Sequence, residues 1–170
     1  DAEIQRVQLR NEGPVQFAVS GETLRIDSLR VVGDNTDFSA TGSIQLSGER
    51  KLDLHGTGEI GLQIIQTYDS DFTGSGKIEA EANLTGTLSS PLVRGKLRIE
   101  DASLADVNLP SALSALNGTL TFSQNQVTIE TLTAQTGGGN VSFSGHAELV
   151  GKQINFNLTA KGESVRLRYP

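Results

Sequence analysis

Apolar and polar residues alternate with a period of two along most of this chain. The pattern is clearest from Lys77 to Leu88, where every second residue from Ile78 to Leu84 is apolar and the residues between them are polar. Because successive side chains of a β-strand point to opposite faces of the sheet, such a segment has one apolar and one polar face. Strands covered on both faces read instead as continuous apolar runs. The pattern therefore predicts an all-β chain that forms an antiparallel amphipathic sheet.

Short polar segments separate the alternating stretches and have the composition of hairpin turns. They are Ser20-Gly21, Gly33-Asp34-Asn35, Ser47-Gly48, Ser123-Gln124-Asn125 and Gly151-Lys152. Connections of this length are too short for the crossover helices that parallel strands require. We therefore expect consecutive strands to pair as hairpins.

Two segments depart from the alternation. Leu62, Ile65 and Tyr68 recur at near-helical spacing, which predicts a short amphipathic helix over residues 61–70. We expect this helix to plug or cap one end of the sheet. Residues 101–115 lose the period of two, and we expect a weakly structured crossing there with one helical turn.

The chain contains an internal repeat. Residues 24–51 align without gaps onto residues 127–154, and Gly42 of the first copy corresponds to Gly145 of the second. Because the chain also starts and stops within strand patterns, we expect residues 1–170 to be a single fragment of an elongated sheet.

Both copies of the repeat share a slip in the apolar phase. Leu24 and Ile26 keep one phase before Leu29 takes the other, and the same slip follows Ile129 in the second copy. A slip of one residue reverses the face of every later side chain unless a bulge or bend absorbs it. Two slips at equivalent places predict a sheet that folds over at a fixed height, twice.

Composition excludes several classes of protein. The chain has a formal net charge of −6 and no cysteine, which excludes disulfides and thiolate metal sites. Its densest basic run, Arg94, Lys96 and Arg98, alternates with uncharged residues and is typical of one solvated strand face. No nucleic-acid partner is therefore predicted. No apolar run approaches the roughly 18 residues of a membrane span.

Two glycine motifs are better explained by structure than by cofactor binding. Residues 56–61, Gly-Thr-Gly-Glu-Ile-Gly, have the spacing of a dinucleotide fingerprint. The predicted helix that follows is too short for a βαβ crossover, so we reject this interpretation. Gly137-Gly138-Gly139 precedes a predicted strand rather than a helix, which favours a wide turn or bulge over a phosphate-binding loop.

Titratable residues do not gather into a recognisable site. His55 and His146 lie on the polar phase of their strands, without a nucleophile or an orienting group in the pattern. Two carboxylate pairs are candidates for acid–base work or calcium binding, although strand faces and turns carry such pairs routinely. They are Glu79 with Glu81, and Asp69 with Asp71. No catalytic residue, metal site or cofactor is predicted, and we do not expect an enzyme.

The apolar face is the remaining candidate for function. Two such faces packed about 10 Å apart would form an ordinary sandwich core. On alternation alone, a sandwich or closed barrel is slightly favoured over an open groove. The many small residues in mid-strand favour the groove, because they leave an apolar surface without the bulk to fill a core, or permit close approach of another molecule.

Several segments resemble the C-terminal region of the TamB proteins. Residues 116–122, 127–134 and 137–145 carry the likeness, and residues 84–95 resemble that family's L-x-G-T-L-x-x-P-x-x-x-G junction. TamB proteins belong to the AsmA-like group of bacterial envelope proteins. The resemblance implies an inner-membrane anchor in the full-length protein, a periplasmic location, and a long sheet bent into a taco-like groove with an apolar interior.

The resemblance also implies a function, namely a non-enzymatic conduit that carries phospholipid acyl chains between the inner and outer membranes. On this hypothesis the acyl chains contact a continuous apolar wall. Its expected residues are Phe17, Ile26, Phe38, Ile44, Leu54, Ile78, Leu84, Phe122, Ile129, Phe143 and Phe156.

Two alternatives remain open. The chain could be a scaffold for outer-membrane protein or autotransporter assembly, which pairs with a client or with an outer-membrane barrel of the TamA type by β-augmentation. It could also be an adhesin-like sandwich, which would have a closed core.

Overall fold

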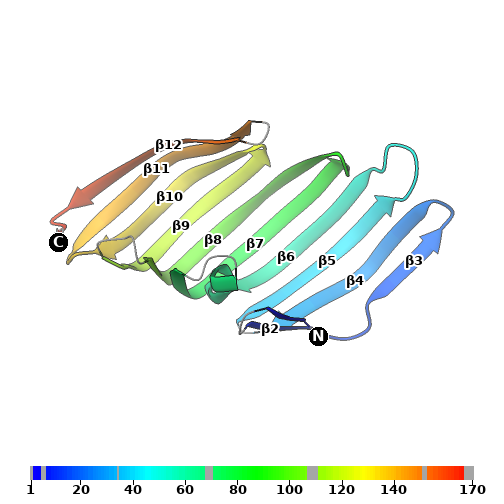
Figure 1. Ribbon diagram of the computed structural model, residues 1–170, viewed down its shortest axis with the longest axis horizontal. Coiled ribbons are helices and arrows are strands. Elements are labelled where there is room, and N and C mark those ends of the chain that lie inside the picture. The colour runs from blue at the N-terminus through cyan, green and yellow to red at the C-terminus, as the bar shows by residue number, and fades with distance from the viewer. Residues whose placement is uncertain are drawn as a thin grey trace.

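The computed structural model describes residues 2–4, 7–33, 35–67, 71–106, 111–150 and 153–166. These residues form strands and one short helix (Figure 1). The strands are β1 (Ala2–Ile4), β2 (Val7–Asn11), β3 (Gln16–Ser20), β4 (Thr23–Gly33), β5 (Thr36–Gln45), β6 (Leu52–Gly61), β7 (Phe72–Thr87), β8 (Ser90–Asp106), β9 (Leu113–Gln124), β10 (Gln126–Thr136), β11 (Gly139–Val150) and β12 (Gln153–Glu163). The helix is η1 (Leu62–Thr67), a 3-10 helix between β6 and β7.

The described strands form one 12-stranded sheet in which β4 to β12 follow chain order. Each of their pairings is antiparallel. β2 and β3 share one edge of β4, β3 beside its first half and β2 beside its last residues. The prediction of an all-β chain in an antiparallel sheet is confirmed.

The predicted turn residues lie between the strands, at the points where the alternation of apolar and polar residues stops in the sequence. β3 joins β4 at Gly21, and the connection from β5 to β6 contains Gly48, both with positive φ. Asn35 and Gln124, at two further predicted turns, have φ of 53° and 60°. Residues 151–152 lie outside the described residues, but the register pairs Val150 with Gln153 across them.

The sheet is neither closed nor strongly curled, so the expected taco-like groove is wrong for the described strands (Figure 1). Both phase slips are instead β-bulges. In β4 the register shifts between Ile26 and Leu29, and in β10 it shifts between Ile129 and Thr133. A bulge adds one unpaired residue and returns the later side chains to their original face. The slip is therefore absorbed locally, and the sheet does not have to fold over.

The predicted helix over residues 61–70 is present only as η1, in the tighter 3-10 form. Gly61 belongs to β6, and residues 68–70, with Tyr68, lie outside the described residues. η1 packs against β7, and Leu62 is buried on the sheet. An isolated α-helix of six residues would have little stability, because helix formation is cooperative and needs length. Short 3-10 helices are frequent as connectors between other elements.

The weakly structured crossing expected over residues 101–115 is wrong. β8 continues to Asp106 and β9 begins at Leu113, while residues 107–110 lie outside the described residues. The alternation is hidden because Asp101 and Ala115 have φ of 44° and 46° and the register between β8 and β9 shifts beside them. Asn117 supports this irregularity, since its Oδ1 accepts a hydrogen bond from the Asp101 N–H at 3.0 Å.

Candidate functional site

The strand register gives the sheet one apolar face. Residues paired across an antiparallel sheet share a face, and Ile26, Gly42, Leu54 and Leu84 form one such cross-strand row. By the same argument all eleven expected wall residues lie on this face. They are Phe17, Ile26, Phe38, Ile44, Leu54, Ile78, Leu84, Phe122, Ile129, Phe143 and Phe156.

The rows also contain apolar residues that the expected set left out. Leu97 and Leu120 pair with each other and link Ala80 to Ile129 across four strands. Simple alternation was enough to find them. Leu62 is different, because it belongs to η1 and reaches the apolar face only through the fold.

Burial on the apolar face changes from one end of the strands to the other. Near η1 lies a buried cluster in which Ala102 is 0% exposed. Its buried members are Leu62, Ala102, Leu116, Ala134 and Val141. At the opposite end, which we call the far end, Leu88 is 53% exposed. Val19, Leu46, Leu149 and Ile154 are also exposed there. Leu52, which pairs with Ile44 at this end, is buried, so the described residues leave the far end of the apolar face uncovered only in part.

Large side chains fill some of the space above the small residues. A Cβ atom added to Gly56 would lie 2.5 Å from Cζ of Phe38, so the Phe38 ring covers this glycine from the next strand. In the same way, a Cβ on Gly118 would lie 2.7 Å from Cδ1 of Leu132. The expectation that small residues leave room is therefore wrong at Gly56. Cross-strand neighbours occupy the space, as in aromatic–glycine pairs of other sheets.

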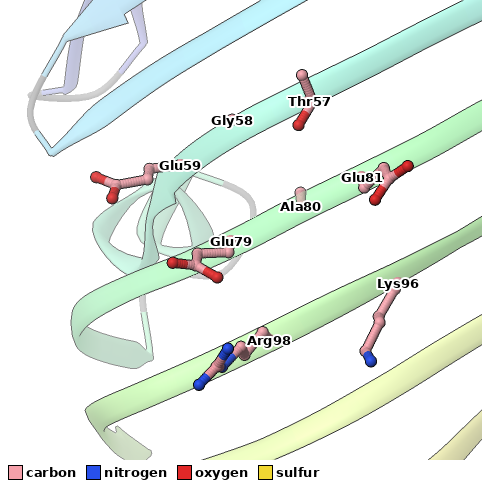
Figure 2. Close-up of a pocket in the computed structure, with 8 residues that line it drawn as sticks. All are labelled: Thr57, Gly58, Glu59, Glu79, Ala80, Glu81, Lys96 and Arg98. Atoms are coloured by element: carbon pink, nitrogen blue, oxygen red, sulfur yellow. The ribbon is translucent and has the colours of Figure 1, made fainter.

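The opposite face is polar and carries charges of both signs. Figure 2 shows Glu79 and Glu81 on β7 beside Arg98 and Lys96 on β8. The register pairs Glu79 with Arg98 and Glu81 with Lys96, while Glu59 of β6 is opposite Glu79. The twist of the three strands forms a shallow hollow of about 430 Å³ between these side chains. The hollow is open to solvent, and its charges are typical of a solvated strand face.

Ion pairs connect neighbouring strands on the polar face. Arg30 donates two hydrogen bonds to the carboxylate of Asp37, at 2.7 and 2.6 Å, and lies 3.0 Å from Oε2 of Glu12. The hydrogen bond from Arg30 lowers the pKa of the Asp37 carboxyl below its usual value. Lys77 donates to Glu59 at 2.7 Å, and this bond raises the pKa of the Lys77 ammonium. Because these pairs are exposed, they add little stability.

The chemical motifs of the sequence occupy ordinary structural positions. Residues 56–61 lie inside β6, so they do not form a phosphate-binding loop. Nδ1 of His55 lies 2.9 Å from Oδ1 of Asn83 on the polar face. His146 lies in β11 and pairs with Thr128 and Asn157. In the described ranges, no group of three or more His, Asp or Glu residues is arranged to hold a metal ion. Asp69 lies outside these ranges, so its pairing with Asp71 is not described.

The arrangement suits binding of an apolar ligand rather than covalent chemistry. The apolar face extends across the sheet from β3 to β12, and several of its side chains at the far end are in contact with solvent. Within the described chain, no helix is long and apolar enough to span a membrane.

Comparison with known proteins identifies one family. A family model described as the TamB C-terminal domain matches residues 24–129. The match covers the segment from β4 into β10, including residues 84–95 and the first bulge of the repeat. No curated protein and no solved structure matches the chain.

Proposed function

The chain belongs to the TamB family, and from this membership we propose that it is a non-enzymatic stretch of a periplasmic lipid conduit. In this proposal phospholipid acyl chains lie against the apolar face on their way between the inner and outer membranes. The observation that carries the proposal is the exposure of large hydrophobic side chains on one face of the sheet. Phe156 is 67% exposed and Phe17 is 65% exposed. Large uncovered apolar patches mark binding surfaces on soluble domains.

The affinity in this proposal comes from the face as a whole. Each acyl methylene removed from water contributes about 0.8 kcal/mol, with no need for a directional contact. The eleven wall residues, from Phe17 to Phe156, therefore act collectively. Neighbouring strands lie about 4.8 Å apart, so an acyl chain that leaves the apolar residues of one strand meets those of the next. Its movement along the sheet therefore does not cross a polar barrier.

The polar face has a complementary role. Its ion pairs and hydroxyl groups remain hydrated, which keeps that side of the sheet in water while the other side holds lipid.

The family context extends the proposal to the whole protein. TamB proteins are cell-envelope proteins with an inner-membrane anchor and an outer-membrane barrel partner of the TamA type. We propose the same anchor, partner and periplasmic location here.

A charge on the apolar face tests the conduit. Leu84→Glu puts a carboxylate in the row that joins Leu54 to Val93. Asn83→Glu adds the same charge on the neighbouring residue, but on the polar face and opposite Arg94. The full-length protein is purified from its envelope, and bound phospholipid is measured by native mass spectrometry and by lipid extraction. We expect phospholipid with the wild type and with Asn83→Glu, and a strong loss with Leu84→Glu. An equal lipid content in all three proteins, or none in the wild type, contradicts the conduit.

One observation favours a second candidate function. Among the described residues, β12 lies at one end of the strand order, and all eleven of its residues are exposed. Such an edge can accept a strand from a client or barrel partner. A proline at a β12 residue whose N–H points away from β11 removes one donor to such a strand. Under the scaffold hypothesis, this variant loses partner binding and retains bound phospholipid.

A further inference from the structure

η1 covers one end of the apolar face. Leu62 is only 5% exposed and belongs to the buried cluster that contains Ala102 and Leu116. Leu62 packs against Gly74 in β7, and we call this position the seat of Leu62. A Cβ atom on Gly74 would lie 3.2 Å from the carbonyl oxygen of Leu62 and 3.3 Å from its Cβ. Because Gly74 has no side chain, the η1 backbone approaches the sheet closely at this point.

The direction of Gly74 shows which face is covered. Gly74 pairs with Leu104 of β8, and Leu104 pairs with Leu113 of β9. The adjacent pair, Ser75 and Ser103, lies on the polar face, where the two hydroxyl oxygens are 2.6 Å apart. Leu62 therefore lies over the apolar row of Gly74, Leu104 and Leu113.

η1 contacts β7 and β2. At its start, the N–H of Gly61 donates to Oγ1 of Thr36 at 3.1 Å, and Thr36 is buried. Two turns of 3-10 helix have little stability of their own. Oε1 of Gln63 is buried and has no hydrogen-bond partner in the described part of the chain, which opposes the seated position. The burial of Leu62 therefore contributes to keeping η1 on the sheet.

From these contacts we infer that η1 is a stop, a segment that blocks acyl chains while it lies on the sheet and that can leave the sheet. Leu62 is the residue that anchors it there. When η1 is seated, acyl chains are confined to the part of the apolar face between η1 and the far end. When η1 leaves Gly74, the row of Leu104 and Leu113 becomes available. This inference rests on the proposed lipid function and adds a boundary within the apolar face.

The boundary is tested by mapping where lipid touches the full-length protein. The probe is a vesicle of phosphatidylethanolamine and phosphatidylglycerol that contains phosphatidylethanolamine with a diazirine in one acyl chain. After irradiation, labelled residues are located by mass spectrometry of peptides. We compare the far-end stretch, residues 84–88, with the stretch near η1, residues 102–106. In the wild type, we expect residues 102–106 to carry about a tenth of the far-end label or less, because Leu62 must first leave its seat.

Gly74→Leu releases η1 without adding a charge, because its side chain occupies the seat of Leu62. We expect the label on residues 102–106 to rise about tenfold, to the level of the far end. Thr73→Leu is the matched control, since Thr73 is the exposed neighbour on the other face, and it is expected to leave the map unchanged. If Gly74→Leu fails to fold, Leu62→Ser provides the same release by weakening the anchor itself.

The outcomes separate the two proposals. Equal labelling of both stretches in the wild type overturns the stop and leaves the lipid conduit in place. The stop is also overturned if Gly74→Leu and Leu62→Ser both fold and label residues 102–106 no more than the wild type does. Absence of label from both stretches of the wild type contradicts the conduit itself.

Discussion

Phe156 offers the sharpest test of whether the apolar face holds lipid, because its folding role is small. It lies on β12 and pairs with Ala147 on the apolar face. The residue is 67% exposed, so only about one third of its surface is buried by the fold. Full burial of a phenylalanine contributes about 1.5–3 kcal/mol, so the loss of this third in Phe156→Glu costs folding only about 0.5–1 kcal/mol.

The expected effect on lipid is larger. An acyl chain that covers the exposed two thirds of Phe156 gains about 1–2 kcal/mol there, all of which is lost in Phe156→Glu. A carboxylate placed against methylenes adds a desolvation penalty. We therefore expect the apparent affinity for vesicle phospholipid to fall by about tenfold or more.

The assay pairs lipid binding with stability for two variants of one strand. Asn157→Glu adds the same charge one residue away, on the polar face opposite His146. Binding to vesicles of phosphatidylethanolamine and phosphatidylglycerol is measured by co-flotation, and stability by urea unfolding. The reasoning is refuted if Phe156→Glu binds as well as Asn157→Glu, or if its lost binding is matched by general unfolding.

Three further predictions concern the sheet itself. Leu116→Ala empties a buried position beside η1, and we expect it to lower the free energy of unfolding by about 2–5 kcal/mol in urea titrations. Gly42→Ala introduces a side chain at φ 133° whose Cβ would lie 2.1 Å from the carbonyl oxygen of Asp53, so it should destabilise by more than about 2 kcal/mol and lower the melting temperature. The Arg30 pair lowers the pKa of Asp37, so its stabilisation is present above the unfolded pKa and is lost as the pH falls through the folded value. Asp37→Asn should therefore reduce the melting temperature slightly at pH 7, and this difference should shrink as the pH falls and Asp37 becomes protonated.

Much of the fold could be predicted because the direction of a strand side chain depends only on local geometry. The alternation from Ile78 to Leu84 was enough to define a strand, its two faces and its antiparallel class. The turns at Gly21 and Gly48 were predictable for the same local reason, since their residues tolerate the positive φ that a tight turn requires.

Two of the failures, those at residues 101–115 and at the phase slips, have a common cause in bulges. The strand residues from 101 to 106 were missed because Asp101, at positive φ, interrupts the period that would have identified them. The slip after Ile26 was recognised, but whether it produces a bend or a local bulge depends on the partner strand. On β5, Gly42 pairs with the residue before the bulge and Ala40 with the residue after it, and β5 pairs with β6 without a register shift. The sheet therefore continues without folding over.

The sequence by itself determined which residues share the apolar face, because a period of two is a property of the extended backbone alone. It could not determine how much of that face is covered. The position of Leu62 over Gly74 and the cover of Gly56 by Phe38 join residues from different strands or from a helix and a strand. Such contacts exist only when register and twist bring the two segments together. The tertiary structure therefore decided where the apolar face is buried and where it remains open to a ligand.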